Sequence, residues 1–575
     1  MTIVARDPSV RHADGRVVMA RIAVPAEDLH PGPRGYRVQV VDYDAAAGVF
    51  HGAHDLPRPD EREPRHWRDG TAGILRDRRF HAQNAYALAM RTLARFESAL
   101  GRRLDWSFDS HQIKIAPHAL HEPNAYYSSD DEGLVFGSFV GASGGRVHAV
   151  LSHDVVVHET AHALLDGLRP SYSVPSSPDQ AAFHEGFSDV VALLSVFALP
   201  EVVEHLLRGV PGAVDGDDCV RATACTEEAL RRSALFGLAA EVGGERPGGD
   251  GDVLRRSITL DPEEVRLGER EFDEPHRRGE AFVAAVMRGF VAAWAARIVG
   301  IGTPNQRRYP LRRVVEEGAD IADALLTLWI RSIDYLPPVH VTFGDALSAV
   351  LTSDRRVRPA DGRWGLRDRI RASFGDYGIR PAGAADGCWE RIPAGLRTDG
   401  IHFDSLRFDE AEVFRFLWTN RETLGLRPEA HTRVLSVRPC RRVGDDGFVL
   451  HETVVEYVQI LKPTLADLRA MRVRVPDELK RWLRAAAGPD RGDDGVTLPA
   501  IRGGGILVFD EYGVPLYHVH NDVLGEAQWD RLLHLLRSGS LTATGDGSFS
   551  IRTARPAALR RLPGFDAPRR GREAW

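Results

Sequence analysis

Two neighbouring stretches in the first third of the chain place apolar residues at helical spacing. The first begins near Asp154, continues to Leu165, and meets helix-stopping residues at Gly167 and Pro170. The second is an apolar run from roughly 181 to 199. The pattern therefore predicts two helices with a loop between them.

The rest of the chain mixes strand and helix patterns, with breaks that predict separate regions. A β-like run at 36–43 precedes a Pro- and charge-rich linker at 57–64, and a Pro/Gly/Ala stretch at 381–387 marks a second boundary. Beyond it, strands alternate with helix-like segments: strands at 448–461 and in a hairpin-like 505–519, helices at 405–424, 464–471 and 476–487. We expect an α+β fold with a small β-rich region (1–75), a central domain (76–380) and a C-terminal module (381–575).

The two predicted helices carry residues that can bind a metal ion. His158 and His162 are four residues apart, so about 40° around a helix and about 6 Å along it separate them, and both imidazoles can reach one cation. Glu185 on the second helix supplies a carboxylate. Two imidazoles and one carboxylate leave a fourth tetrahedral position for water, which is typical of catalytic zinc. We therefore expect one zinc ion at this site.

Two further carboxylates have roles that follow from their spacing. Glu159 lies beside the first histidine, within reach of a zinc-bound water whose pKa falls towards about 7, and can act as its general base. Asp189, one turn after Glu185, can accept a hydrogen bond from the non-ligating nitrogen of His158 and fix its tautomer. The sequence therefore predicts a metal-dependent hydrolase.

Other histidines fit a metal site less well. His451-Glu452 starts a similar motif, but Val455 stands where the second histidine would be, and the β-branched run predicts a strand without a metal role. His518 and His520 fall on one face of a strand with no third ligand nearby in sequence, and we expect surface residues there.

These motifs resemble the thermolysin-like gluzincin metallopeptidases over roughly residues 78–380. The segment 154–166 looks like the active-site helix of that family, and 185–189 looks like its third-ligand helix. Segments 123–127 and 134–137 are similar to the edge strand that pairs with the substrate backbone. The resemblance implies a small β-rich lobe and a mainly helical lobe, with the zinc helix at the floor of the cleft between them.

The resemblance also implies further site residues. Asn124 and the backbone of Ala125 would bind an extended peptide, and Arg255 would hold the carbonyl next to the cleaved bond. His276 and Tyr172 would stabilise the oxyanion. Alternatively, His276 is a surface residue of the charged segment 274–280, and Tyr172 is an ordinary packing residue.

Calcium is not predicted, because an acidic run is missing after the third-ligand helix. Only Glu201 and Glu204 lie nearby, whereas calcium needs several oxygen ligands.

Composition narrows the functional class further. The net charge of −7 over 575 residues argues against a dedicated nucleic-acid binder. The N-terminus lacks a signal-peptide core, no apolar run approaches the roughly 20 residues of a membrane span, and the four cysteines show no C-x-x-C spacing. We expect a cytoplasmic protein without a nucleic-acid or membrane partner.

Two functions follow from these features. The favoured one is a zinc endopeptidase that cleaves a peptide or protein substrate. The alternative is a catalytically silent, zinc-stabilised scaffold that binds a protein partner through 381–575. Glu159 favours the enzyme, because a scaffold has no use for a general base.

Overall fold

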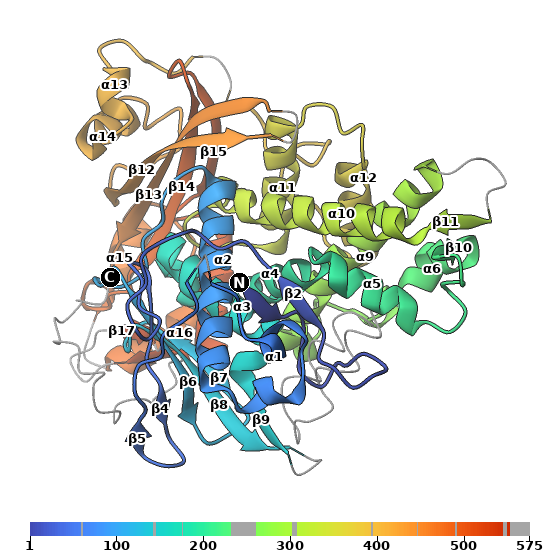
Figure 1. The fold of residues 1–575 in the computed structure, drawn as a ribbon. Helices are drawn as coiled ribbons and strands as arrows, with labels where there is room; N and C mark the ends of the chain where they lie inside the picture. The colour runs from blue at the N-terminus through green and yellow to red at the C-terminus, as the bar shows by residue number, and fades with distance from the viewer. Residues whose placement is uncertain are drawn as a thin grey trace.

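The computed structural model has helices and sheets in one mixed α+β arrangement (Figure 1). It describes residues 1–58, 61–141, 145–174, 176–231, 260–301, 307–392, 395–444, 447–488, 492–543 and 549–551. This confirms the α+β class.

A seven-stranded sheet lies in the N-terminal half of the described chain. Its main path runs β5-β4-β6-β8-β7, while β3 pairs with β6 and β9 pairs with β8. The strands are β3 (Val38–Val40), β4 (Tyr43–Asp44), β5 (Val49–Phe50), β6 (Ile113–Leu120), β7 (Ala125–Ser128), β8 (Gly133–Val140) and β9 (Arg146–His148). Strand β7 ends the path and runs antiparallel to β8, so the predicted edge strand is present.

Helix α2 (Arg78–Leu100) is a long buried helix that contacts this sheet and helix α3 (His153–Leu168). Its first turn is capped by Asp77, whose side chain accepts from the N–H groups of Arg79 and Phe80. It ends at Gly101, where a φ of 70° suits a residue without Cβ.

The two helices predicted for the metal site are present as α3 (His153–Leu168) and α4 (Pro178–Phe197). Helix α4 begins three residues earlier than the apolar pattern indicated. Ser177 caps it by accepting from the N–H of Gln180, and Pro178 occupies the first turn, where its missing N–H is no loss. Helices α3 and α4 contact each other, which brings the predicted ligands of the two helices together.

Seven further helices of the described chain belong to this half. They are α1 (Arg65–Arg68), α5 (Pro200–Gly209), α6 (Glu227–Leu230), α9 (Pro275–Ile301), α10 (Leu311–Ser332), α11 (Phe343–Val357) and α12 (Leu366–Asp376). Of these, α5, α9 and α10 contact α4. Short pairs of strands complete this half: β1 (Thr2–Val4) with β2 (Met19–Arg21), and β10 (Cys219–Arg221) with β11 (Arg308–Pro310). Helix α9 contacts α4, α10 and α12, and so lies in the middle of the helical group.

The expectation that no apolar run reaches the length of a membrane span needs correction at α9. Among the described residues, Pro275–Gly300 passes that test, with a mean hydropathy of 1.6 over its best 18-residue window. Most of that window, 72%, is buried inside the protein, as in a core helix. Helices α4 and α5 pass only when taken together, and a bend of 80° separates them.

The C-terminal part forms a four-stranded antiparallel sheet in the order β12-β13-β14-β15. The strands are β12 (His431–Val443), β13 (Val449–Leu461), β14 (Ile501–Asp510) and β15 (Pro515–Asn521). Helices α13 (Phe403–Leu406), α14 (Glu410–Thr419), α15 (Leu465–Ala470), α16 (Asp477–Ala487) and α17 (Glu526–Arg537), and the pair β16 (Leu541–Ala543) and β17 (Phe549–Ile551), accompany it. The predicted strands and helices are confirmed, except that 405–424 is two short helices.

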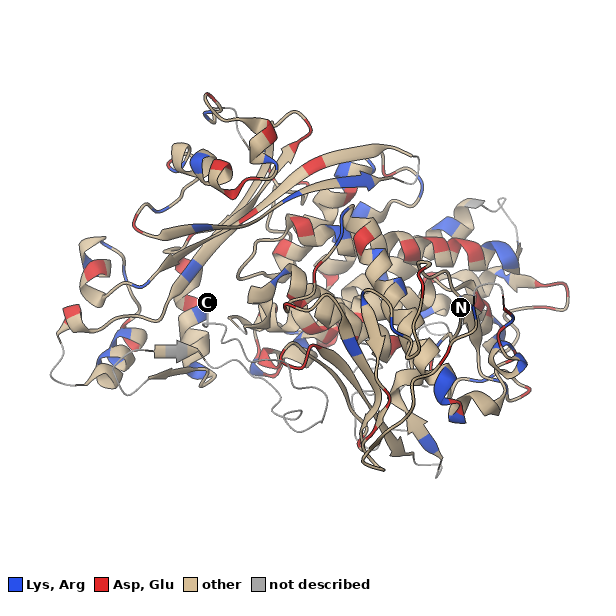
Figure 2. Ribbon diagram, turned by 60° about the vertical axis from the view of Figure 1, so that its left-hand side comes forward, with Lys and Arg blue, Asp and Glu red and all other residues tan. Residues whose placement is uncertain are grey.

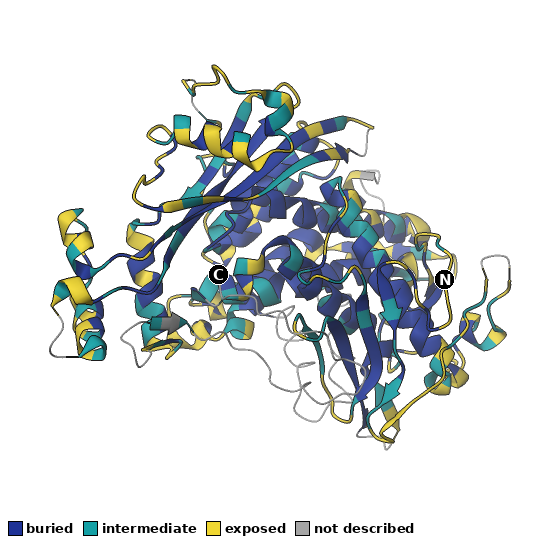
Figure 3. Ribbon diagram, turned by 90° about the vertical axis from the view of Figure 1, so that its left-hand side faces the viewer, coloured by how far each residue is buried: buried dark blue, intermediate teal, exposed yellow. Residues whose placement is uncertain are grey.

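This sheet packs on the helical half of the protein through a continuous core (Figure 3). Side chains of β14 and β15 belong to the same buried cluster as those of α3, α4 and α9. Charges of both signs are spread over the fold (Figure 2). Arg442 of β12 is buried between the carboxylates of Asp334 and Glu452, and Arg102 also pairs with Asp334 at 2.6 Å. Buried ion pairs therefore join the sheet to the helices.

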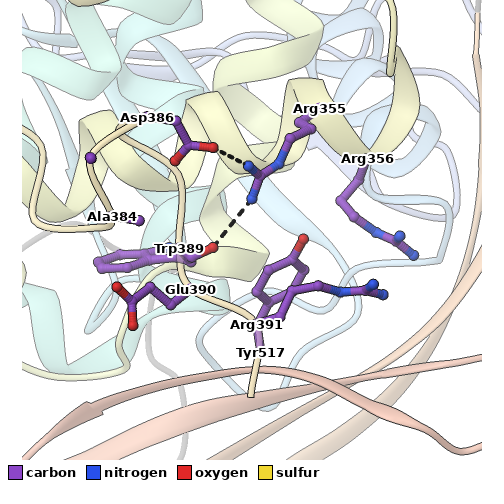
Figure 4. Close-up of a pocket in the computed structure, with 9 residues that line it drawn as sticks. Arg355, Arg356, Ala384, Asp386, Trp389, Glu390, Arg391 and Tyr517 are labelled. Carbon is purple, nitrogen blue, oxygen red and sulfur yellow. Dashed lines mark hydrogen bonds and ion pairs between the residues drawn. The ribbon is translucent and has the colours of Figure 1, made fainter. Parts of the chain in front are cut away.

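A cavity of about 740 Å³ lies where α11 meets the C-terminal part (Figure 4). Arg355 and Arg356 of α11, Arg391 and Tyr517 line it, together with residues of the 384–390 segment. The guanidinium of Arg355 pairs with Asp386 and donates to the carbonyl of Trp389. None of the predicted site residues that the structure describes lines this cavity.

Candidate metal centre

Helices α3 and α4 bring His158, His162 and Glu185 to one point. The two histidine Nε2 atoms are 2.8 Å apart. The Oε2 atom of Glu185 lies 3.4 Å from His162 Nε2 and 3.8 Å from His158 Nε2. One potential ligand atom from each residue lies within 4.8 Å of the others. The three predicted ligands therefore converge as one cation would require.

The outer nitrogen of each imidazole has its own partner. His158 Nδ1 lies 2.8 Å from the carboxylate of Asp189, as the spacing predicted. His162 Nδ1 lies 3.1 Å from the hydroxyl of Ser188, which itself donates to the carbonyl of His184 and so accepts from the imidazole. Both protons are thus held on the outer side, and both Nε2 lone pairs face inward.

The two Nε2 atoms are 2.8 Å apart, so their lone pairs repel each other unless a positive charge lies between them. Burial would lower the pKa of His158, but Asp189, Glu159 and Glu185 outweigh it and raise that pKa to about 10. Burial opposes ionisation of Glu185 too, yet the two histidines hold its pKa far below its usual value. The site therefore favours a positive charge, and its nitrogen and oxygen donors fit a metal ion such as zinc.

Glu159 is almost fully buried on α3 and is tied to the edge strand. Its Oε2 atom accepts a hydrogen bond of 2.8 Å from the backbone N–H of Tyr127 on β7. The hydroxyl of Tyr127 donates to Asp166, also on α3, at 3.0 Å. Tyr127 therefore fixes β7 along the metal helix at two points.

His276 reaches the rim of the centre from the start of α9. Its Nε2 atom is 3.7 Å from Glu185 Oε2, and its Nδ1 atom is 2.8 Å from Glu274 Oε1. The side chain is 52% exposed, at the solvent side of the ligand group. The structure thus brings His276 to the ligand group.

The contacts that the structure shows for Tyr172 are with residues other than the three predicted ligands. It is buried, its hydroxyl donates to the carbonyl of Pro337 at 2.6 Å, and its ring packs edge-on against Phe183. This hydroxyl already has a partner, so a role for Tyr172 at the oxyanion stays a prediction.

The predicted substrate residues lie at the free edge of the sheet, where the structure describes them. Asn124 is exposed just before β7, and its side-chain carbonyl accepts from the N–H of Ala125 at 2.9 Å. Ala125 pairs with Phe136 of β8, which leaves the other side of β7 open to α3. Arg255 lies outside the described residues.

Sequence reasoning missed three contributors to the centre. Ser188 stands one turn from Glu185 on the same face of α4, a spacing that could have indicated a partner for the second imidazole. Glu274 was one of several acidic residues near His276 and carried no distinguishing signal. Tyr127 acts through its backbone N–H, which side-chain identity does not reveal.

Comparisons with known proteins give little information on this chain. No family model matches the chain. No curated protein matches it. One similar solved structure is the precursor of protealysin, a metalloproteinase from Serratia proteamaculans, at 14% identity and a TM-score of 0.34. That match covers 60% of this chain and 89% of the other.

Proposed function

We propose that this protein is a zinc-dependent peptidase of the thermolysin-like type, with its catalytic unit at about 78–380. The observation that carries the proposal is the convergence of His158, His162 and Glu185, with Glu159 on the same helix as the histidines. These three side chains would hold the ion. When bound, zinc acts as a Lewis acid that lowers the pKa of its water towards about 7.

The protein's own groups then move the proton. Glu159 takes it from the attacking water and later passes it to the departing amine. The N–H of Tyr127 engages Oε2 of this carboxylate, so Oε1 is the oxygen left to accept the proton. Asp189 and Ser188 keep the two imidazoles in the tautomer that presents Nε2 to the ion.

His276 would stabilise negative charge on the substrate. Glu274 holds Nδ1, so the imidazole presents Nε2 beside the ligand group. In its doubly protonated form, the imidazolium would donate from Nδ1 to Glu274 and from Nε2 to the oxyanion, where it replaces a less ordered water.

The edge strand suits an extended peptide. Ala125 and Tyr127 are two residues apart on β7, so their backbone N–H and C=O groups point to the same side of the strand. That side is the open edge towards α3, where the N–H of Tyr127 reaches Glu159. A substrate added there as a further strand would run past Asn124 and reach the metal centre with its backbone aligned. Arg255 is proposed to hold the neighbouring carbonyl. The 381–575 part would then bind a protein partner.

A single substitution tests the proposal. Glu159→Gln keeps the size and burial of the side chain but removes the base. We expect zinc content equal to that of the unmodified protein and loss of cleavage across a peptide library. Glu410→Gln, on the exposed face of α14, is the matched control and should cleave normally.

Two results would contradict the enzyme. Cleavage that survives Glu159→Gln would remove the proposed base. Bound zinc with no cleavage by either protein, across a diverse library, would instead support the scaffold function.

A further inference from the structure

A second group of three histidines lies outside the proposed active site. His81 comes from the first turn of α2, His118 from β6, and His148 from the end of β9. Their ring centroids are 5.1 Å (81 to 118), 4.6 Å (81 to 148) and 5.2 Å (118 to 148) apart. His81 and His118 are fully buried, and His148 is half-buried. Three elements far apart in sequence thus bring three imidazoles together.

Outer partners fix the protons of the two buried rings. His81 Nε2 lies 3.1 Å from the carbonyl oxygen of Ile74, which can only accept, so this nitrogen carries the proton. His118 Nδ1 lies 2.8 Å from Asp42 Oδ1. The same oxygen accepts from the guanidinium of Arg78 at 2.7 Å, as a carboxylate does, so it accepts from His118 too. Arg78 is also 3.1 Å from His118 Nδ1, but the carboxylate is closer and decides the tautomer.

The inner nitrogens therefore meet as two acceptors. His81 Nδ1 and His118 Nε2 are 2.9 Å apart, and each presents a lone pair once the outer nitrogen holds the proton. His158 and His162 show the same arrangement at 2.8 Å, with outer partners on both rings. Such a pair needs a cation or a shared proton between the rings.

His148 completes the group with a third nitrogen. One ring nitrogen from each histidine lies within 4.8 Å of the other two. The Nδ1 atom of His148 is buried and has no hydrogen-bond partner within the described part of the chain.

A cavity of about 280 Å³ opens onto the group. His118 and His148 line it together with Arg78, Arg146, Ser138 and Asp44. It provides an entry path and room for a solvent ligand, whose negative charge the two arginines would favour. Three imidazoles with a fourth position open to solvent are a donor set that zinc takes readily.

We propose that His81, His118 and His148 form a second metal site that binds a divalent transition-metal ion. The three imidazole donors favour zinc, and its fourth coordination position would open to the cavity. Asp42 and the carbonyl of Ile74 orient two of its ligands. The ion would fasten α2 to β6 and β9. It is separate from the ion of the proposed active site and does not depend on peptidase activity.

Zinc content of the full chain tests this site. The protein is stripped with a chelator, reloaded with zinc chloride, freed of excess metal and measured by mass spectrometry. We expect about two zinc ions per chain, about one in His118→Ala, about one in His162→Ala and none in the double variant. His111→Ala, at an exposed position, should keep both.

A second variant shows whether zinc is lost because a ligand is missing or because the protein has unfolded. His148→Gln changes the half-buried ligand at the cavity, and circular dichroism checks that the fold remains. Folded His148→Gln with about one zinc ion supports the site. An unmodified protein that holds a single ion, lost entirely in His162→Ala, overturns it, because a proton then bridges His81 and His118. An ion lost in His118→Ala but kept in His162→Ala would contradict the active-site zinc instead.

Discussion

Arg169, which follows the last turn of the metal helix α3, forms a fully buried ion pair with Glu456 of strand β13. The same guanidinium donates to the backbone carbonyl of Ile333. The end of the helix that carries His158 and His162 is thus held by a residue almost three hundred positions further along the chain. The C-terminal sheet therefore supports the metal centre through a charged contact.

Removal of one partner of this pair should destabilise the whole protein. Glu456→Ala leaves the Arg169 charge buried without its carboxylate, which costs about 3–5 kcal/mol in the free energy of unfolding. Urea denaturation followed by circular dichroism measures it. Glu422→Ala, at an exposed site, should change stability by no more than about 0.5 kcal/mol. The double variant Arg169→Met with Glu456→Leu should recover much of the loss, because neither charge then remains buried; equal stability of all four proteins would contradict the role of the pair.

Asp189 should control metal affinity rather than the chemical step. Asp189→Asn replaces the carboxylate that orients His158, and we expect zinc affinity to fall by about 10- to 100-fold. Competition with a chromogenic chelator measures this fall, with cleavage restored at saturating zinc. Asp368→Asn, whose side chain is 83% exposed, is the control. An unchanged dissociation constant would mean that the contact does not position the ligand.

His276 can be separated from an ordinary surface histidine by kinetics. If its Nε2 donates to the oxyanion, His276→Ala should lower kcat by about 100- to 1000-fold with little change in KM. Zinc content should stay unchanged, because His276 is not among the ligands. His111→Ala provides the comparison for loss of an exposed imidazole. A kcat within twofold of the unmodified protein would assign His276 to the surface.

The buried carboxylate of Asp334 should make stability sensitive to acid. Burial opposes its ionisation, but Arg102 and Arg442 hold its pKa well below the usual value. Its contribution is therefore fully present above the unfolded pKa of about 3.9 and is lost as the pH falls below that value. Denaturation midpoints between about pH 6 and pH 3 should decline, and Asp334→Asn, less stable throughout, should show a shallower decline. Parallel profiles would contradict this assignment.

The sequence allowed the metal helix to be predicted because its ligands are four residues apart on one element, where helix geometry alone brings them together. Strand β12 escaped prediction because Arg438, Arg441 and Arg442 make it look polar, although Glu452 and Glu456 of β13 neutralise two of these charges. The cluster of His81, His118 and His148 was invisible for another reason. Its members are brought together only by the packing of α2 on the sheet, and no local spacing encodes that contact.

In the proposed peptidase, the hydrogen bond from Tyr127 to Glu159 would link substrate docking to the proton shuttle. A peptide bound along β7 would contact the same strand that holds the base. Correct seating of the ligand would therefore tune the orientation of the carboxylate, whereas a badly aligned chain would disturb it. Substrate selectivity would then depend on the rate of cleavage as well as on binding affinity. A poorly aligned substrate would bind without being cleaved.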